Sequence, residues 1–329
     1  MRAIVHDPDH FDAPLEWREV PDPVPVAGEV LVEVHAAALN RADLMQRAGQ
    51  RPHARASEIL GLEMAGRVRS TAPDVTGWRA GDRVCALLPG GGYAELATVP
   101  AAMLMRVPER LSLTAAAGVP EVFLTAFSAL FWEGRLQPGE TVMIHAGASG
   151  VGTAAIQMAR RAGATVIATA GGPRKVAACT ELGAHLALDR HTTDFAPAVA
   201  DAFGGVDVII DMVGEAYYAR NIALLKTLGR MVFVAAQSGH RFPVDVYDLT
   251  SKRLSLIGTT LRSRPVEEKV RLTRAFEERF GDDLASGAIR PVIDRVVPVQ
   301  EVAAAHAAME ANENIGKIVL AMPVAGVDG

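Results

Sequence analysis

The chain has 329 residues, of which 50% are hydrophobic and 22% charged, with a formal net charge of −5. This composition excludes an intrinsically disordered protein, and the length favours two domains over one. The acidic balance and the lack of any Lys/Arg block argue against a nucleic-acid partner.

The remaining global features indicate a soluble cytoplasmic protein. No apolar run reaches the roughly 20 residues needed to cross a membrane, so we expect no membrane partner. The N-terminus lacks the apolar stretch of a signal peptide. The two cysteines, Cys85 and Cys179, stand far apart in the sequence and are typical of free thiols in a reducing compartment.

The first 120 residues predict a small antiparallel, barrel-like unit. Short β-rich runs such as 29–34 are separated by Pro- and Gly-rich segments such as 21–25 and 77–82. Short strands joined by turns of this kind are typical of antiparallel sheets.

From about residue 140 onwards, strands and helices alternate. Apolar strands are predicted over 141–145, 165–169, 206–210, 230–234 and 254–258, with helices over 151–162 and 173–182. Beyond 266 we predict a long helix, a strand over 292–297, a helix over about 299–310 and a strand over 317–321. Continuous apolar strands between helices predict an α/β fold with a parallel sheet covered on both faces.

The most informative segment is 145–152 (HAGASGVG), which lies where a strand ends and a helix begins. This is the setting that a dinucleotide-binding fingerprint requires. Gly147 permits the tight turn, Gly152 lets the helix pack closely, and the N–H groups at the helix start face a pyrophosphate. Ser149 replaces the usual second glycine, and its hydroxyl can donate to a phosphate. The predicted cofactor contacts here are Gly147, Ala148, Ser149, Gly150, Val151 and Gly152.

Two other interpretations of this loop fit less well. A nucleophile elbow, G-x-S-x-G, fails because Val151 stands at the final glycine position, which argues against a serine hydrolase. A tight turn with no ligand is the structural alternative. The strand–loop–helix–strand context favours the cofactor site.

The second strand distinguishes the two nicotinamide cofactors. An NAD site usually carries an acid about 20 residues after the first glycine, whereas 168–175 contains no acid and ends in two cations. These cations would pair with the additional phosphate of NADPH, although a merely solvated helical turn is the alternative. Cations at a helix N-terminus oppose its dipole unless they hold an anion. We therefore predict NADPH, held at this corner by Gly171, Gly172, Arg174, Lys175 and Arg190.

Several separated segments resemble the quinone oxidoreductases, the zinc-free, zeta-crystallin-like family of the medium-chain dehydrogenase/reductases. They are 40–47 (NRADLMQR), 60–63 (LGLE), 145–152, 261–264 (LRSR) and 309–317 (MEANENIGK). The resemblance extends to about residue 321 and is closest to the tumour-suppressor-inducible branch of animals. It implies a GroES-like, β-rich catalytic domain over 1–120 that the chain rejoins over 265–329. It also implies a Rossmann, doubly wound NADP-binding domain over 121–264, with the active site in the cleft between the two domains.

The resemblance also implies which residues act. Zinc-dependent relatives place a Cys near Asn40 and a His at Leu62, so we expect no catalytic metal here. The chemistry then reduces to positioning a hydride donor against a flat quinone-like acceptor. Asn40 would orient the acceptor or the nicotinamide ribose, or else cap a turn. Arg51 replaces a pocket tyrosine of relatives and favours an anionic or more polar acceptor, or else points to solvent. Further implied cofactor contacts are Thr125, Ala235, Ser238, Thr260, Leu261 and Asn314.

Two alternative functions stay open at this stage. A 2-enoyl thioester or enone reductase shares the fold and the hydride donor, although the tyrosine acid that such enzymes often carry near Asn40 is missing here. A redox-silent NADPH-binding protein would bind the cofactor and turn over no quinone. The family further implies a homodimer whose strands near 254–259 pair edge to edge, since such an edge otherwise exposes unpaired backbone groups.

Overall fold

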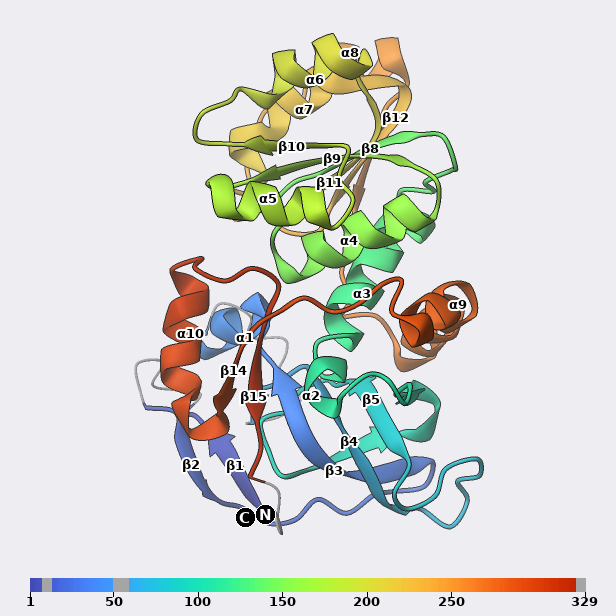
Figure 1. Ribbon diagram of the computed structural model, residues 1–329, viewed down its shortest axis with the longest axis vertical. Helices are drawn as coiled ribbons and strands as arrows, with labels where there is room; N and C mark the ends of the chain where they lie inside the picture. Colours follow the sequence, from blue (N-terminus) through green and yellow to red (C-terminus); the bar gives the residue numbers. More distant parts are fainter. Residues whose placement is uncertain (8–13, 50–58, 324–329) are drawn as a thin grey trace. The chain divides into compact units, whose positions relative to one another are not determined.

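The computed structural model describes residues 1–7, 14–49 and 59–323. The chain forms two compact units, each of which is described by itself (Figure 1). Unit 1 comprises Met1–Val122 and Arg262–Gly329, and unit 2 comprises Phe123–Leu261. Within the described ranges, no helix combines the length and the apolar character needed to span a bilayer.

Unit 1 is rich in β-structure. Its strands are β1 (Arg2–Val5), β2 (Glu16–Glu19), β3 (Glu29–Ala38), β4 (Glu63–Thr71), β5 (Arg83–Leu87), β6 (Leu96–Pro100), β7 (Met105–Arg106), β14 (Ile293–Pro298) and β15 (Lys317–Ala321). The larger sheet has the order β14-β15-β3-β4-β5-β7, with β6 also pairing β3, and β1 pairs β2 in a second sheet. All of these pairs are antiparallel except β14–β15. The antiparallel, β-rich unit expected at the start of the chain is therefore confirmed.

Strand β3 links the two ends of the chain. Its burial alternates along most of its length and becomes continuous over its last three residues, so one face and then both faces are covered. Those last residues pair with β15, in the register Val319↔Ala38 and Leu320↔Ala37. The C-terminal segment thereby completes the sheet of unit 1. The helices of unit 1 are α1 (Arg41–Arg47), α2 (Leu113–Ala116), α9 (Val266–Ser286) and α10 (Val302–Glu310), with short 3₁₀ turns η2 (Ala101–Met103) and η5 (Val299–Glu301).

Helix α3 (Pro120–Phe127) begins in unit 1 and leads into unit 2, followed by the π-helical turn η3 (Ser128–Glu133). The strands of unit 2 are β8 (Thr141–Ile144), β9 (Thr165–Ala170), β10 (Leu186–Asp189), β11 (Val206–Asp211), β12 (Leu225–Phe233) and β13 (Ser255–Gly258). Its helices are α4 (Gly150–Arg161), α5 (Pro173–Glu181), α6 (Phe195–Phe203), α7 (Tyr218–Leu224) and α8 (Val246–Lys252), with a 3₁₀ turn η4 (Glu215–Tyr217).

The six strands of unit 2 form one parallel sheet in the order β10-β9-β8-β11-β12-β13. Numbered from β8, this is the order 3-2-1-4-5-6 of a doubly wound sheet. The α/β fold class predicted from the sequence is confirmed. The order reverses between β8 and β11, which places the loops that follow these two strands at the switch point where such sheets bind ligands.

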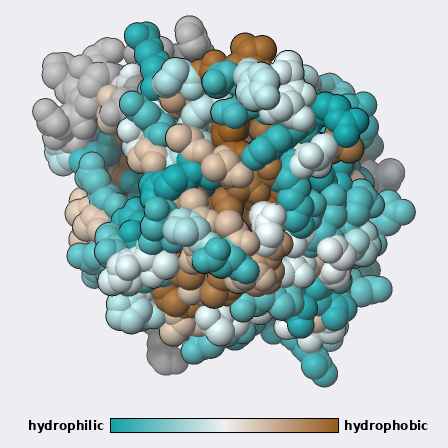
Figure 2. All heavy atoms as spheres, turned by 90° about the horizontal axis from the view of Figure 1, so that it is seen from above, coloured by the Kyte–Doolittle hydropathy of each residue, from teal (hydrophilic) through white to brown (hydrophobic). Residues whose placement is uncertain are grey.

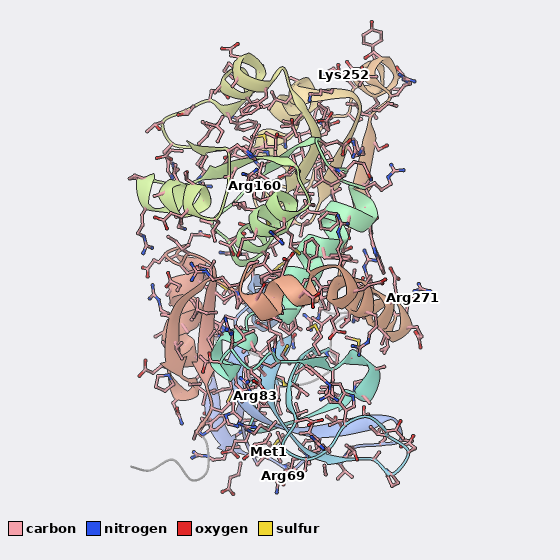
Figure 3. All side chains as sticks on the ribbon, turned by 45° about the vertical axis from the view of Figure 1, so that its right-hand side comes forward. Met1, Arg69, Arg83, Arg160, Lys252 and Arg271 are labelled. Carbon is pink, nitrogen blue, oxygen red and sulfur yellow. The ribbon has the colours of Figure 1, made fainter. Side chains whose placement is uncertain are left out.

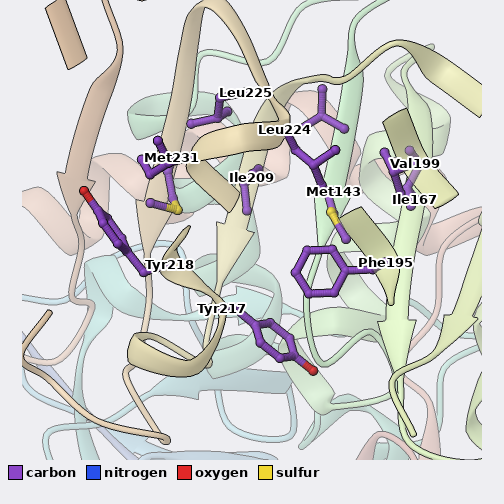
Figure 4. Packing of buried hydrophobic residues seen from close by; sticks show 12 residues of the cluster. Met143, Ile167, Phe195, Val199, Ile209, Tyr217, Tyr218, Leu224, Leu225 and Met231 are labelled. Atoms are coloured by element: carbon purple, nitrogen blue, oxygen red, sulfur yellow. The ribbon is translucent and has the colours of Figure 1, made fainter. Parts of the chain in front are cut away.

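The strands of unit 2 are apolar because helices cover both faces of the sheet. Figure 4 shows part of the core, in which strand residues pack against side chains of α6 and α7. The labelled core residues include Met143, Ile167, Phe195, Val199, Ile209, Tyr217, Leu224 and Met231.

The end of α7 is capped by a side chain of the next helix. Lys252, at the end of α8 (Figure 3), donates to the carbonyl oxygens of Ile222 and Ala223 near the end of α7. A cation there satisfies carbonyls that have no partner inside the helix.

Candidate functional site

The loop between β8 and α4 requires glycine at two positions. A Cβ atom on Gly152 would lie 2.6 Å from the carbonyl oxygen of Gly147. A Cβ atom on Gly147 would lie 2.9 Å from both the Cβ of Ala168 and the Sγ of Cys179. Both separations are shorter than van der Waals contact, so only glycine lets the turn and the helix approach this closely.

Helix α4 presents its first backbone N–H groups at this loop. Ser149 is the N-cap, and its Oγ accepts a hydrogen bond of 3.0 Å from the N–H of Gly152. The N–H groups of Gly150 and Val151 belong to the first turn, where the helix itself offers no acceptor. Together with the positive end of the helix dipole they fit an anion such as a pyrophosphate. The hydroxyl of Ser149 donates its hydrogen to Met212 Sδ at 3.8 Å.

A buried polar network lies beneath the loop. His145 Nε2 is 2.8 Å from Asn221 Oδ1, and its Nδ1 is 2.9 Å from Thr169 Oγ1. Asn221 in turn donates from Nδ2 to Asp211, so its Oδ1 accepts and His145 carries its proton on Nε2. Burial lowers the pKa of His145 to about 4, so the ring is neutral at neutral pH. The network ties together the ends of β8, β9 and β11.

A second corner forms where β9 and β10 end. Gly172 donates its N–H to Asp189 Oδ1 at 3.0 Å, and His191 does the same at 3.0 Å. These backbone hydrogen bonds lower the pKa of Asp189. A Cβ atom on Gly171 would lie 3.2 Å from Nε of Arg190 and 3.0 Å from Nε2 of His191. The structure therefore brings Arg190 beside the predicted glycine pair, and it adds His191, for which we had no expectation.

Helix α5 supplies two more cations at this corner. Its N-cap is Gly172, at φ +83°, and Pro173 is its first residue. Arg174 and Lys175 consequently lie in the first turn of α5, beside the glycine pair. Three cations at a helix N-terminus fit a phosphate group, because the charge of the phosphate offsets their unfavourable interaction with the dipole.

The other predicted cofactor contacts lie outside the 145–152 loop and the corner at β9 and β10. Ser238 Oγ donates to Val213 O at 2.7 Å and accepts from the N–H of Ala216, so its oxygen is used within unit 2. Thr125 is buried in α3. Asn314 belongs to unit 1 and donates to Gly316 O at 2.7 Å. Three further predicted contacts lie in loops of unit 2 after β12 and β13, namely Ala235, Thr260 and Leu261.

Unit 1 contains a buried polar cluster around Asn40, just before α1. The amide of Asn40 donates from Nδ2 to Glu63 Oε1 at 3.0 Å and to Ala38 O at 3.2 Å. Its Oδ1 accepts from Lys317 Nζ at 2.7 Å. Lys317 also forms an ion pair of 2.7 Å with Glu63, and the two side chains are 4% and 0% exposed. Both N–H groups of the Asn40 amide are thus used inside unit 1.

Asp43 completes this cluster from the first turn of α1. It accepts hydrogen bonds from the N–H groups of Asn40 and Gly61 and from the hydroxyl of Tyr93 at 3.0 Å. Burial raises the pKa of Asp43 to about 6. Burial also raises the pKa of Tyr93 well above its usual value, with the charge of Asp43 adding to the effect. The tyrosine is therefore a poor proton donor to anything outside the cluster.

Glu121 approaches the same cluster from the first turn of α3. Its backbone N–H donates to Glu63 Oε2 at 2.8 Å. Its carboxyl group faces Glu63, Lys317, Asp43 and, from α9, Lys269. Burial raises the pKa of Glu121 to about 8, and the charge of Glu63 contributes to the shift.

Four residues of this cluster were not predicted to have a role: Glu63, Lys317, Asp43 and Glu121. A signal was present, because Lys317 begins an apolar strand and Glu63 precedes three small or apolar residues that are buried with it. A charge in such a place is normally paired with another charge. Which partner it finds depends on the sheet pairing of β15 with β3, which no local pattern shows.

Two predictions about the site concern a metal and Arg51. Within the described ranges, no group of three or more His, Cys, Asp or Glu side chains could hold a metal ion. Leu62 is buried in the core at 1% exposure. The lack of a catalytic metal stays a prediction. Arg51 lies outside the described residues.

Comparisons with known proteins agree with this architecture. The alcohol dehydrogenase GroES-like domain matches residues 26–109, and the family described as zinc-binding dehydrogenase matches residues 150–276. The chain is 31% identical to the 2-haloacrylate reductase of a Burkholderia species, over 97% of this chain and 98% of that protein. It is 32% identical to the quinone oxidoreductase of Mus musculus, over 91% of this chain and 90% of that protein.

A solved structure gives the same picture. The quinone oxidoreductase of Thermus thermophilus, also solved in complex with NADPH, matches with a TM-score of 0.83 at 32% identity. The match covers 98% of this chain and 100% of that one. The GroES-like nature of the β-rich region is thereby confirmed.

The buried ion pair predicts a large loss of stability on truncation. Lys317→Met leaves the buried carboxyl group of Glu63 without its cation, and we expect the free energy of unfolding to fall by about 3–5 kcal/mol. As a control, Arg18→Met breaks the Arg18–Glu16 pair, whose side chains are 59% and 56% exposed, and should cost about 0–1 kcal/mol. Urea denaturation measures both. Equal, small losses in the two variants would show that the buried pair is not stabilising.

Proposed function

The chain belongs to the quinone oxidoreductase family of the medium-chain dehydrogenase/reductases, and from this premise we propose that it transfers hydride from NADPH to quinone-like carbonyl acceptors. The general activity of an NADPH-dependent oxidoreductase follows from the family, whereas the choice of acceptor is our proposal. We further propose that unit 1 is the catalytic domain and unit 2 the NADP-binding domain. The tumour-suppressor-inducible branch stays a prediction.

The cofactor is NADPH, and the observation that carries the assignment is the arrangement of glycines and cations in unit 2. The N–H groups of Gly150 and Val151 would hold the pyrophosphate, with the hydroxyl of Ser149 turning from Met212 Sδ to donate to it. Arg174, Lys175 and Arg190 would pair with the ribose phosphate that distinguishes NADPH from NADH. When bound, NADPH supplies a hydride from C4 of its nicotinamide ring. The other predicted contacts remain part of this proposal: Thr125, Ala235, Ser238, Thr260, Leu261 and Asn314.

Asn40 has two proposed roles, and the hydrogen bonds of its side chain favour one of them. Both N–H groups donate inside the cluster, so a carbonyl acceptor would find no donor on this amide. Its Oδ1 accepts from Lys317 and retains a second lone pair. A ribose hydroxyl can donate to that lone pair. We therefore propose that Asn40 orients the nicotinamide ribose rather than the acceptor.

The acceptor is proposed to be a quinone, with an enone or 2-enoyl thioester as the alternative. Relatives at similar identity are named for quinone and for 2-haloacrylate, so the family leaves this choice open. Enoyl reductases often use a tyrosine acid near the position of Asn40. Tyr93 is the tyrosine of unit 1, and it is fully buried with its hydroxyl bonded to Asp43. This burial supports an acceptor whose reduction needs no tyrosine.

An absorbance assay of NADPH oxidation distinguishes the candidate functions. We expect turnover with 9,10-phenanthrenequinone and much slower turnover with crotonyl-CoA. Faster reduction of crotonyl-CoA would establish the enoyl reductase alternative. NADPH binding without turnover on a panel of quinones and enones would establish the redox-silent alternative.

The cation corner predicts cofactor selectivity. Reversing the charge of Arg174, Lys175 and Arg190 to Glu should raise the KM for NADPH by about tenfold or more, since charge-assisted hydrogen bonds to the phosphate are lost. The KM for NADH should change little. Arg271→Glu, which alters an exposed cation on α9, is the control and should affect neither cofactor. An equal loss for both cofactors would refute the assignment.

We also propose a homodimer that pairs β13 of two chains. β13 is an edge strand of its sheet, and Val246 and Tyr247 of the preceding helix are 65% and 76% exposed. Large exposed hydrophobic groups are typical of protein interfaces. Figure 2 shows a band of hydrophobic residues on a face that is otherwise mostly hydrophilic.

Backbone alternation in β13 provides a test of the dimer. Thr259 donates its N–H to Phe233 O of β12. Since backbone N–H groups alternate in direction along a strand, the N–H of Ile257 also points to β12 and the N–H of Leu256 points to the free edge. Leu256→Pro removes an outward N–H and no bond to β12. Sedimentation equilibrium should show a dimer for the wild type and a monomer for Leu256→Pro. A monomeric wild type would exclude the dimer.

A further inference from the structure

The turn after β10 contains a histidine that the proposed function leaves unused. Arg190 and His191 follow Asp189, the last residue of β10, and both side chains are exposed. Thr192 and Thr193 donate their N–H groups back to Asp189 O at 3.2 and 2.9 Å, which closes the turn. Two basic side chains therefore leave the same tight turn at one end of the sheet of unit 2.

The carboxylate of Asp189 fixes this turn to the loop after β9. One of its oxygens, Oδ1, accepts from the N–H of Gly172 and from the N–H of His191, each at 3.0 Å. The N–H of Arg190 donates to Ala170 O at 2.9 Å. These three hydrogen bonds hold the loop and the turn side by side. Every residue that takes part belongs to unit 2, so the fold of that unit alone sets the position of His191.

The tips of both basic side chains converge on Gly171. A Cβ atom on Gly171 would lie 3.0 Å from His191 Nε2, 3.2 Å from Arg190 Nε and 3.5 Å from Arg190 Nη2. Gly171 does not have a positive φ, so its backbone conformation would suit other residues as well. What the glycine provides is room for the imidazole and the guanidinium group beside the same backbone atom.

Neither tip has a hydrogen-bond partner in the protein. In the ranges that the structure describes, the side chains of Arg190 and His191 make no hydrogen bond and no close ion pair. Asp189 interacts with both through its charge, but its Oδ1 is occupied by the two backbone N–H groups. Helix α5 begins at this corner, and Gly172 supplies no side-chain oxygen to its first turn. Two side-chain donors beside the positive end of a helix suit a phosphate group.

We propose that His191 donates from Nε2 to the ribose phosphate of NADPH and thereby helps the protein to select NADPH over NADH. This inference rests on the proposed function, because it requires the ribose phosphate to bind at this corner. The imidazole contacts a phosphate oxygen beside the guanidinium of Arg190, and Gly171 leaves space for the phosphate. Asp189 is a positioning residue for this contact, since it acts through the backbone N–H of His191.

The chemistry of a phosphate explains why an imidazole is useful beside an arginine. A phosphate monoester presents three acceptor oxygens, and the fork of one guanidinium binds two of them. A neutral imidazole donates from the nitrogen that carries its hydrogen, and an acceptor at Nε2 places the hydrogen there. NADH has a hydroxyl group in place of the phosphate, and this smaller, uncharged group gives His191 no comparable acceptor. The contact therefore favours NADPH.

Fluorescence titration of the full chain with NADPH and with NADH tests the proposal. For His191→Leu we expect the Kd for NADPH to rise about tenfold, because a hydrogen bond to a charged group is lost. The Kd for NADH should stay the same. His191→Gln places an amide N–H near the former position of Nε2 and should recover part of the lost affinity for NADPH.

His185→Leu is the matched control. His185 is another exposed histidine of unit 2, and it directly precedes β10, at the opposite end of the strand from His191. Its ring contacts Arg160 and the N–H of Val166. The replacement removes a histidine with partners of its own, and it should leave the ratio of the two Kd values unchanged.

Two variants of Asp189 test its positioning role. Asp189→Asn keeps an oxygen that accepts from Gly172 and His191, so the affinity for NADPH should be no weaker than in the wild type. Asp189→Ala removes that acceptor and should weaken binding of NADPH more than binding of NADH. Equal Kd ratios in Asp189→Ala and the wild type would show that the carboxylate does not position His191.

A fragment of the cofactor separates phosphate binding from the rest of the molecule. Adenosine 2′,5′-bisphosphate carries the ribose phosphate and lacks the nicotinamide. It should displace NADPH from the wild type, and its Kd should be about tenfold higher for His191→Leu. An unchanged Kd for this fragment would show that the imidazole does not contact the phosphate.

The outcomes distinguish this inference from the proposed function. If the wild type prefers NADPH and His191→Leu keeps the same preference, His191 is not a phosphate ligand, although the cofactor assignment stands. If His191→Leu loses affinity for both cofactors equally, its role is structural and the inference is wrong. A wild type that binds NADPH no more tightly than NADH would overturn the cofactor assignment itself.

Discussion

The close backbone approach between Gly147 and Gly152 is the constraint on which the cofactor site depends. Any side chain at Gly152 would collide with the preceding turn, and the first turn of α4 would then move away from the end of β8. With glycine in both places, the helix starts directly at the point where the strand order reverses. The N–H groups of α4 are therefore aimed at the place where a doubly wound sheet binds its ligand.

The polar network under the loop holds this geometry without adding charge. The neutral ring of His145 connects Thr169 on β9 to Asn221 on α7, and Asn221 reaches Asp211 at the end of β11. Asp211 in turn accepts hydrogen bonds from the N–H groups of Val213 and Gly214. Three neighbouring strands are thus fixed at their carboxyl ends, which keeps the loops that follow them in register.

Unit 1 buries several acidic side chains together with few cations. Asp43, Glu63 and Glu121 converge on Lys317, which β15 brings from the far end of the sequence to the end of β3. Burying an unpaired charge is expensive, so a carboxyl group without a cation of its own is neutralised by a proton instead. The same arrangement raises the pKa of Glu121, because burial and the charge of Glu63 disfavour its anion. The burial that brings Glu63 and Lys317 together therefore also shifts the pKa of the neighbouring carboxyl group.

Periodicity and turn residues were sufficient to predict most of the fold. The strand expected over 317–321 has those bounds in the structure, and the helices beginning near 150 and 173 were predicted within one residue at each end. The helix expected over 299–310 is a 3₁₀ turn over Val299–Glu301 followed by α10. Strand β12 starts five residues earlier than expected. Thr227 and Leu228 are exposed there, and Leu228 has φ +65°, so the apolar pattern of the strand is interrupted.

The candidate site could be predicted only where its residues are local in sequence. The loop at 145–152 and the corner at 171–175 each lie beside a strand end, and a strand end can be read from the pattern. Arg190 could be predicted for the same reason, because it directly follows the end of β10. The cluster around Asn40 joins α1, β4, α3 and β15, so it depends on long-range pairing that composition and spacing do not reveal.

A crystal structure of the NADPH complex would show which backbone groups hold the cofactor. We expect the pyrophosphate against the N–H groups of Gly150 and Val151, with the ribose phosphate beside Gly171 and the guanidinium of Arg190. A pyrophosphate bound away from the 145–152 loop, or a ribose phosphate with no cation of this corner near it, would contradict this expectation.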